Sequence, residues 1–186
     1  MGSIDPDVER VTREMLDAAI RGEIAALAAR VESIGGERYG QVLGLCLTAA
    51  AYVAVDVSGG WPTEADVRDI SRIVAEHEKA IELSEGDVRA YLTFAALGFR
   101  PLEEAMGSVQ KAASLPLSIT GGLLSRFRPE GSSWEDYLGQ IWTATRAAEG
   151  TDLSVLPALL VRDRQAAASD ERKSFPRVTA FLPPLA

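Results

Sequence analysis

The sequence predicts an all-α protein: a single-domain orthogonal or up-down bundle of about six to seven helices around one buried central helix at residues 39–57. No charged side chain occurs between Arg38 and Asp56, and the run between them is small and aliphatic on every helical face. A helix that is apolar all round has to be buried all round. Elsewhere, apolar residues recur at helical spacing between capping signals, and no four-residue alternating strand pattern occurs before the C-terminal tail.

The uncharged run also resembles a membrane span, but its length and composition argue against one. It has 17 residues, at the lower end of the spanning range, and contains Gln41 and Thr48 without a Trp, Lys or Arg belt at its far end. The N-terminus leads directly into a charged amphipathic segment, so no signal peptide is predicted. We therefore expect a soluble protein with no membrane contact and a cytoplasmic location.

The first helix begins at Asp5 and Pro6, which form an N-cap and first-turn pair. Apolar residues follow at near-helical spacing as far as the stop at Gly35 and Gly36. Gly22 interrupts this stripe without shifting it. The spacing therefore predicts one long helix, kinked at Gly22, rather than two helices.

The two helices after the central one each follow a capping signal. Thr63 with Asp66 resembles a capping box, with Asp in place of the more usual Glu or Gln, and opens a helix from residue 64 to about residue 83. Residues 84–87 repeat the signal and open a helix that ends near Gly98.

The remaining helices are less evenly marked. Pro101 starts a fifth helix, whereas proline and glycine break up residues 115–131, which predict a short helix or a packed loop. Ser133 caps a sixth helix that ends at Gly150. A seventh is expected over residues 154–169, with a proline in its first turn.

The C-terminal tail predicts a separate extended arm, which gives a helical bundle at residues 1–170 and an arm at residues 171–186. Terminal segments are normally poor in large apolar groups, but this tail places them among three prolines. A proline-stiffened arm loses little entropy on docking, either across its own bundle or into a groove on a neighbouring subunit. The candidate partner-binding residues are Phe175, Phe181, Leu182 and Leu185.

Composition excludes several classes of function. The formal charge of −8 argues against nucleic-acid binding, which depends on neutralising phosphates. Cys46 is the single cysteine and lies inside the apolar run, so no disulfide forms within the chain and the thiol should be an inert packing group. The excess of arginine over lysine and the richness in alanine indicate a bacterial protein.

Few residues are available for catalysis. The chain has no cysteine pair, no second histidine, no phosphate-binding Gly-x-x-x-x-Gly-Lys and no Gly-x-Ser-x-Gly. We therefore expect no metal and no cofactor, and the absence of these motifs argues against an enzyme.

His77 is the most distinctive polar residue, because periodicity assigns it to the core. It lies about 13 residues past the start of its helix, roughly 20 Å along the axis, which matches the height of Gly44 on the central helix. Gln41, Thr48 and Tyr52 share one face of that helix. Either these groups are satisfied locally within the core, or they line a small-molecule pocket with His77.

The three tryptophans have local explanations. Trp61 and Trp134 each lie near the start of a capped helix, where an aromatic side chain staples the turn to the bundle. Trp142 lies beside the main stripe of its helix, so it is either an exposed partner anchor or part of a broad apolar face.

Two classes of function follow from these observations. The first is a protein–protein interaction or regulatory module that acts as a homo-oligomer, such as a homodimer, because the chain combines an acidic surface, few catalytic groups and an apolar arm. The alternative is a helical small-molecule-binding protein, less readily an enzyme, whose ligand-binding candidates are His77, Thr48, Tyr52 and Gln41.

Overall fold

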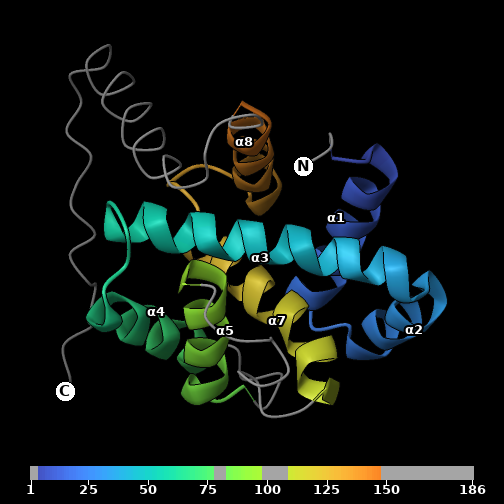
Figure 1. Cartoon of the computed structure of the whole chain (residues 1–186), viewed down its shortest axis with the longest axis horizontal. Helices are drawn as coiled ribbons and strands as arrows, with labels where there is room; N and C mark the ends of the chain where they lie inside the picture. Colours follow the sequence, from blue (N-terminus) through green and yellow to red (C-terminus); the bar gives the residue numbers. More distant parts are fainter. Residues whose placement is uncertain (1–3, 78–82, 98–108, 148–186) are drawn as a thin grey trace.

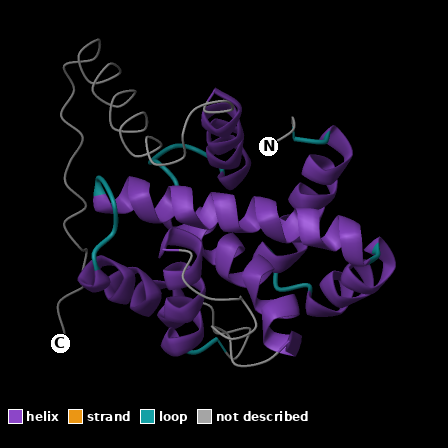
Figure 2. Ribbon diagram, viewed as in Figure 1, coloured by secondary structure: helices purple, strands orange, loops and turns teal. Residues whose placement is uncertain are grey.

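The computed structural model of the protein describes residues 4–77, 83–97 and 109–147. These residues form seven helices and no strand (Figures 1 and 2), which confirms the predicted all-α bundle. The helices are α1 (Pro6–Ile20), α2 (Ile24–Ile34), α3 (Gly36–Ser58), α4 (Glu64–His77), α5 (Glu85–Leu97), α7 (Val109–Phe127) and α8 (Trp134–Ala147). The first part of the helix expected from Pro101, the helix expected over residues 154–169 and the arm at 171–186 lie outside the described residues.

The first expected helix is in fact two helices, α1 and α2, so the prediction of one long kinked helix was wrong. Gly22 has a φ of 70°, in the left-handed region that glycine adopts without strain. Its N–H donates to the Ala19 carbonyl, and the Glu23 N–H donates to the Ala18 carbonyl. This pair of bonds is a Schellman motif, which ends α1 and lets α2 start in a new direction.

α3 crosses the middle of the bundle in Figure 1 and packs against α1, α5 and α7. Its buried side chains are Val42, Leu45, Cys46, Ala49, Ala50, Val53, Ala54 and Val55. The opposite side is less covered, since Gly40 is exposed and Leu43, Leu47 and Ala51 are half-buried. The predicted central helix is therefore a core element with one partly open side.

α3 is also long and apolar enough to cross a membrane, by length and composition, and it is the one such helix among the described residues. A single helix of this kind is weak evidence for a membrane span, because the core helix of a soluble protein has the same properties. The packing of α3 against three other helices is consistent with a soluble protein.

The capping signals expected before α4 and α5 are present. The Thr63 N–H donates to Asp66 Oδ2 at 2.8 Å, and the Asp66 N–H donates to Thr63 Oγ1 at 3.3 Å. The Asp87 N–H likewise donates to Ser84 Oγ at 3.1 Å. The capping box is thus confirmed at Thr63 and Asp66, and aspartate is long enough to close it.

α7 corrects the prediction for residues 115–131, which expected a short helix or a packed loop. A helix of 19 residues runs through Pro116, Gly121 and Gly122. Residues 115–124 are buried without a break, so tertiary packing stabilises the helix despite the N–H that proline lacks. A Cβ on Gly121 would lie 3.0 Å from Ile20 Cγ1. This glycine therefore marks a close approach to α1 and not a break in the chain.

The remaining helices pack around α3 and α7. α7 contacts α1, α3, α4, α5 and α8. Figure 1 shows α4 and α5 on one side of α3, α8 on the other, and α2 near the amino end of α3. α4 packs chiefly against α5 and contacts α3 over a short stretch. Trp142 of α8 is fully buried, so it belongs to a broad apolar face.

Candidate functional site

Three of the four ligand-binding candidates lie on one side of α3, as their spacing predicts. Gln41 is exposed, while Thr48 and Tyr52 are half-buried. Thr48 Oγ1 donates a hydrogen bond of 2.9 Å to the Gly44 carbonyl one turn back. This bond satisfies the Thr48 hydroxyl within its own helix, as expected if Gln41, Thr48 and Tyr52 do not line a pocket.

Two surface hollows lie among the described residues, and neither joins these candidates. Gln41, Asp5 and residues 34–38 line a hollow of about 380 Å³ at the amino end of α3. Another hollow, of about 400 Å³, lies along α1. Thr48 and Tyr52 line neither of these two hollows. Neither hollow could therefore bind a ligand in contact with Gln41, Thr48 and Tyr52 together.

His77 is the last residue of α4. The orientation of its side chain lies outside what the structure describes, so its proximity to Gly44 stays a prediction. No described atom lies within 4 Å of the place that a Cβ on Gly44 would take. The space beside this glycine is therefore not filled by a described side chain.

Tyr52 belongs to an aromatic and carboxylate cluster between α3 and α8. Its ring contacts that of Tyr137 edge to face, with centroids 6.4 Å apart and an interplanar angle of 76°. The Tyr137 hydroxyl donates a hydrogen bond of 2.8 Å to Asp56 Oδ2. Tyr137 is buried and Asp56 half-buried, so the pair fixes α8 against the last turns of α3.

A second polar cluster is buried between α3, α5 and α7. The Tyr91 hydroxyl lies 3.0 Å from Thr120 Oγ1, which donates to the Cys46 carbonyl at 3.4 Å. Burial raises the pKa of the Cys46 thiol to about 12 and raises the pKa of Tyr91 well above its ordinary value. Neither group ionises near neutral pH, so this cluster suits a structural role better than nucleophilic catalysis.

Ion pairs surround the amino end of α3. Asp7 of α1 pairs with Arg38 at 3.3 Å, and Glu14 of α1 pairs with Arg10 at 2.8 Å and with Arg30 of α2. The Arg30 and Arg10 guanidinium groups lower the pKa of Glu14. These ion pairs between helices tie α1, α2 and α3 together.

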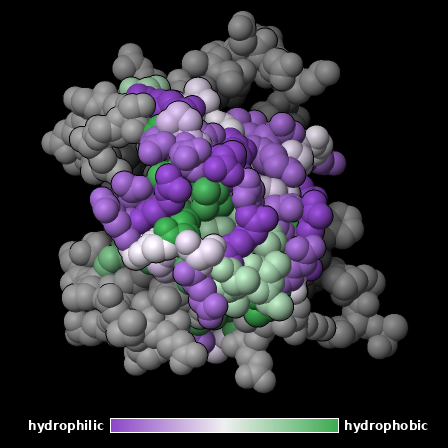
Figure 3. Space-filling view, turned by 90° about the vertical axis from the view of Figure 1, so that its right-hand side faces the viewer, coloured by the Kyte–Doolittle hydropathy of each residue, from purple (hydrophilic) through white to green (hydrophobic). Residues whose placement is uncertain are grey.

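The same end also carries apolar surface. Figure 3, which faces this end of the molecule, shows hydrophobic residues in the middle of a largely hydrophilic face. Ile24, at the start of α2, is 43% exposed. Leu27 is the one buried residue of α2, so most of this short helix faces solvent.

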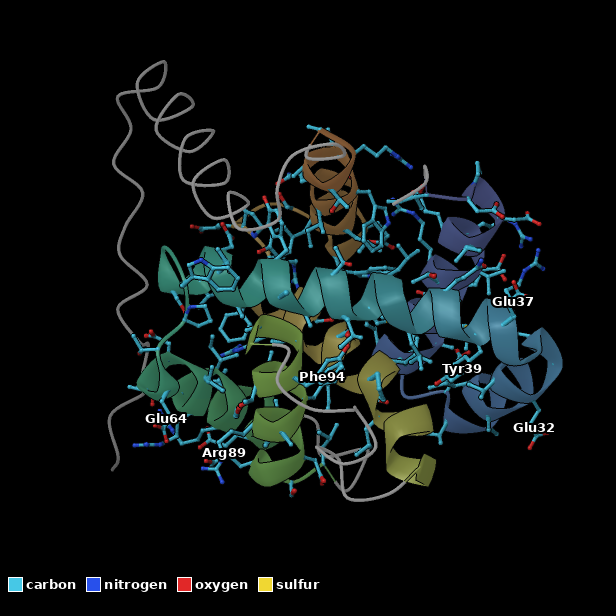
Figure 4. The ribbon with its side chains drawn as sticks, in the orientation of Figure 1. Glu32, Glu37, Tyr39, Glu64, Arg89 and Phe94 are labelled. Carbon is cyan, nitrogen blue, oxygen red and sulfur yellow. The ribbon has the colours of Figure 1, made fainter. Side chains whose placement is uncertain are left out.

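The carboxyl end of α3 has different surroundings. Val57 is 42% exposed and Trp61 is 54% exposed. The expectation that Trp61 staples its turn to the bundle was therefore wrong, whereas Trp134 does pack partly against the core. Figure 4 labels Glu64 at the start of α4, on the outside of the bundle. We call Val57, Trp61 and the charged residues of 64–69 the carboxyl-end surface.

Acids predominate on the carboxyl-end surface. Residues 64–69 contain Glu64, Asp66 and Asp69 but a single base, Arg68. The Glu64 side chain is 90% exposed and lies 3.8 Å from Arg68, while Asp69 pairs with Arg72 at 3.6 Å. Such long contacts between exposed groups are weak.

No group of three or more His, Cys, Asp or Glu side chains in the described part of the chain could hold a metal ion. No protein-family model, curated protein or solved structure matches the chain. The class of protein is therefore defined by its fold, an all-α helical bundle, and its function has to be argued from its surfaces.

Sequence reasoning missed several residues that the structure brings together. Tyr91 and Thr120 are separated by 29 positions, and Tyr137 and Asp56 by 81, so no local spacing indicates either pair. The exposure of Trp61 had a sequence signal, since the glycines at 59 and 60 carry the chain away from the last turn of α3.

Proposed function

We infer that this chain is a protein–protein interaction module that acts as a homo-oligomer in the bacterial cytoplasm. The observation that carries this inference is the exposure of Val57 and Trp61 at the carboxyl end of α3. Large aromatic side chains that project from a surface are the groups that most often dominate the binding energy of protein interfaces. Beside the acidic charge of residues 64–69, they form an anchor for an apolar and basic partner segment.

The inventory of the described residues supports the same function. The two polar clusters join helices to each other, and burial raises the pKa values of the Cys46 thiol and the Tyr91 phenol. The chain also contains the apolar arm residues Phe175, Phe181, Leu182 and Leu185, which suit a partner contact.

The test is the oligomeric state of the full chain and of a variant that lacks residues 174–186, measured by light scattering over a range of concentrations. We expect a mass above that of the 19.9 kDa monomer for the full chain and a lower mass for the variant. A second variant, with serine at the four arm residues, keeps the length and should behave like the deletion. A monomeric full chain would contradict the homo-oligomer.

A further inference from the structure

The carboxyl-end surface combines an exposed aromatic side chain with an unbalanced charge. Trp61 and Val57 are exposed by 54% and 42%, although the bundle has a large core in which other aromatic side chains are buried. They lie next to the three acids and single base of residues 64–69. An exposed apolar group within a charged rim is typical of a contact surface.

The end of α3 adds to the negative character of this surface. A helix carries partial negative charge at its carboxyl end, where basic side chains usually compensate it. The last turn of α3 contains no basic residue. The Schellman bonds from Gly59 to Asp56 and from Gly60 to Val55 satisfy two of its terminal carbonyls, but they contribute no positive charge.

Within this chain, residues 171–186 have the complementary chemistry. They contain three basic residues and one acid, so they carry positive charge where the surface carries negative charge. They also contain two phenylalanines, two leucines and three prolines. Proline-rich segments with apolar side chains bind aromatic surfaces in many recognition domains, because their extended form is already stiff.

We propose that residues 171–186 bind the carboxyl-end surface, with apolar arm side chains on Trp61 and Val57. This binding specifies the contact in the oligomer of the proposed function. An arginine of the arm stacks on the Trp61 indole, where a guanidinium is attracted to the ring face. The basic groups Arg172, Lys173 and Arg177 lie beside the acids of residues 64–69.

The chain between the two parts is long enough for this contact. Residues 148–170 separate the end of α8 from the arm, which is 23 residues. At up to about 3.3 Å per residue, they reach roughly 75 Å. The arm can therefore reach the carboxyl-end surface of its own bundle or of a second copy.

The exposed side of α2 is the competing place, because Ile24 at the start of this helix is 43% exposed. Its exposed apolar group is an aliphatic side chain, whereas the carboxyl-end surface exposes the indole of Trp61. The prolines and arginines of the arm gain more from packing on an indole face than from contact with an isoleucine side chain. We therefore place the arm at the carboxyl end.

Photochemical cross-linking of the full chain tests this placement. p-Benzoylphenylalanine replaces Trp61 in one variant and Ile24 in a matched control, since both side chains are exposed, one shortly after the end of α3 and the other at the start of α2. Circular dichroism confirms that each variant is folded. After irradiation, we expect mass spectrometry to find peptides from residues 171–186 joined to position 61, and several-fold fewer joined to position 24.

Two further measurements test whether the basic residues of the arm contribute to binding and whether the arm binds its own chain or a second copy. Replacing Arg172, Lys173 and Arg177 with glutamine should reduce the cross-link at position 61 several-fold, and added salt should have the same effect. Mixing isotopically light and heavy chains shows whether the arm comes from a second copy. Cross-links within one chain alone support this surface while contradicting the homo-oligomer.

Either of two cross-linking results would contradict the placement of the arm at Trp61. A cross-link from position 61 that omits residues 171–186, or one of equal yield from position 24, would overturn the proposal. An oligomer that forms with no arm cross-link at position 61 would leave the proposed function standing and remove this contact from it.

Discussion

Val53 and Val57 lie one helical turn apart on α3 and have opposite surroundings. Val53 is fully buried, whereas Val57 is 42% exposed. The turn that contains Val53 is packed within the bundle, whereas Val57 in the last turn is open to solvent. The contrast shows that one continuous helix serves two purposes, because its middle stabilises the fold and its end presents a surface.

The largest expected effect comes from shortening these two valines. Val53→Ala should lower the free energy of unfolding by roughly 2 kcal/mol, because it removes buried methyl groups and leaves a cavity. Val57→Ala should change it by less than about 0.5 kcal/mol, since the side chain is exposed. Urea denaturation measures both values. Equal losses would mean that the last turn is as well packed as the middle.

The next largest loss of stability is expected in the buried cluster of Tyr91, Thr120 and Cys46. Thr120→Val should lower the free energy of unfolding by about 1–2 kcal/mol, because the Tyr91 hydroxyl loses its hydrogen-bond partner in the core. Combining it with Tyr91→Phe removes both polar groups, so the double variant should lose less than the sum of the two single variants. Additive losses in this double-mutant cycle would show that the two hydroxyls do not interact.

Because one side of α3 is partly open, a substitution there should make the protein more stable. Gly44→Ala should raise the free energy of unfolding by about 0.5–1 kcal/mol, because alanine favours a helix interior and no described atom lies within 4 Å of the new Cβ. Gly121→Ala is the matched control and should gain less, since its Cβ would lie 3.0 Å from Ile20 Cγ1. Thermal unfolding compares the two. A loss at Gly44 would indicate that another group occupies the space beside it.

The smallest effect concerns the cap that follows Trp61. Hydrogen bonds from the Thr63 hydroxyl and N–H lower the pKa of Asp66. Because the folded pKa lies below the unfolded value of about 3.9, the stabilisation is present above that pH and is lost as the pH falls through the folded pKa. We expect the melting temperature of Asp66→Asn to depend less on pH below about 4 than that of the unaltered chain. Parallel pH profiles would contradict this role for the carboxylate.

The sequence predicted those parts of the fold that depend on local pattern. The uncharged run, the capping pair Thr63 and Asp66 and the periodic stripes each act within a few turns, so α3, α4, α5 and α8 were placed correctly. Gly22 was misjudged because an apolar stripe continues on both sides of a Schellman turn. α7 was misjudged because Pro116 and Gly121 break a helix by propensity, while burial against α1 overrides that propensity.

The site was less predictable than the fold for a physical reason. Thr48 and Tyr52 were placed on the correct helix, but their partners depend on which helices meet, and Tyr137 comes from α8. Trp61 was assigned to a staple because its spacing fits one, although the two glycines before it indicated a change of chain direction, and its 54% exposure shows that it does not pack into the bundle.

The three tryptophans give the molecule its own optical labels. Trp142 is fully enclosed, Trp134 is partly covered and Trp61 is in contact with water. Their emission should therefore combine a blue component from the enclosed indole with a red component from the wetted one. A soluble quencher such as acrylamide should reach the red component first. Unfolding should shift the blue component and leave the red one almost unchanged, so the loss of the core can be followed without any added dye.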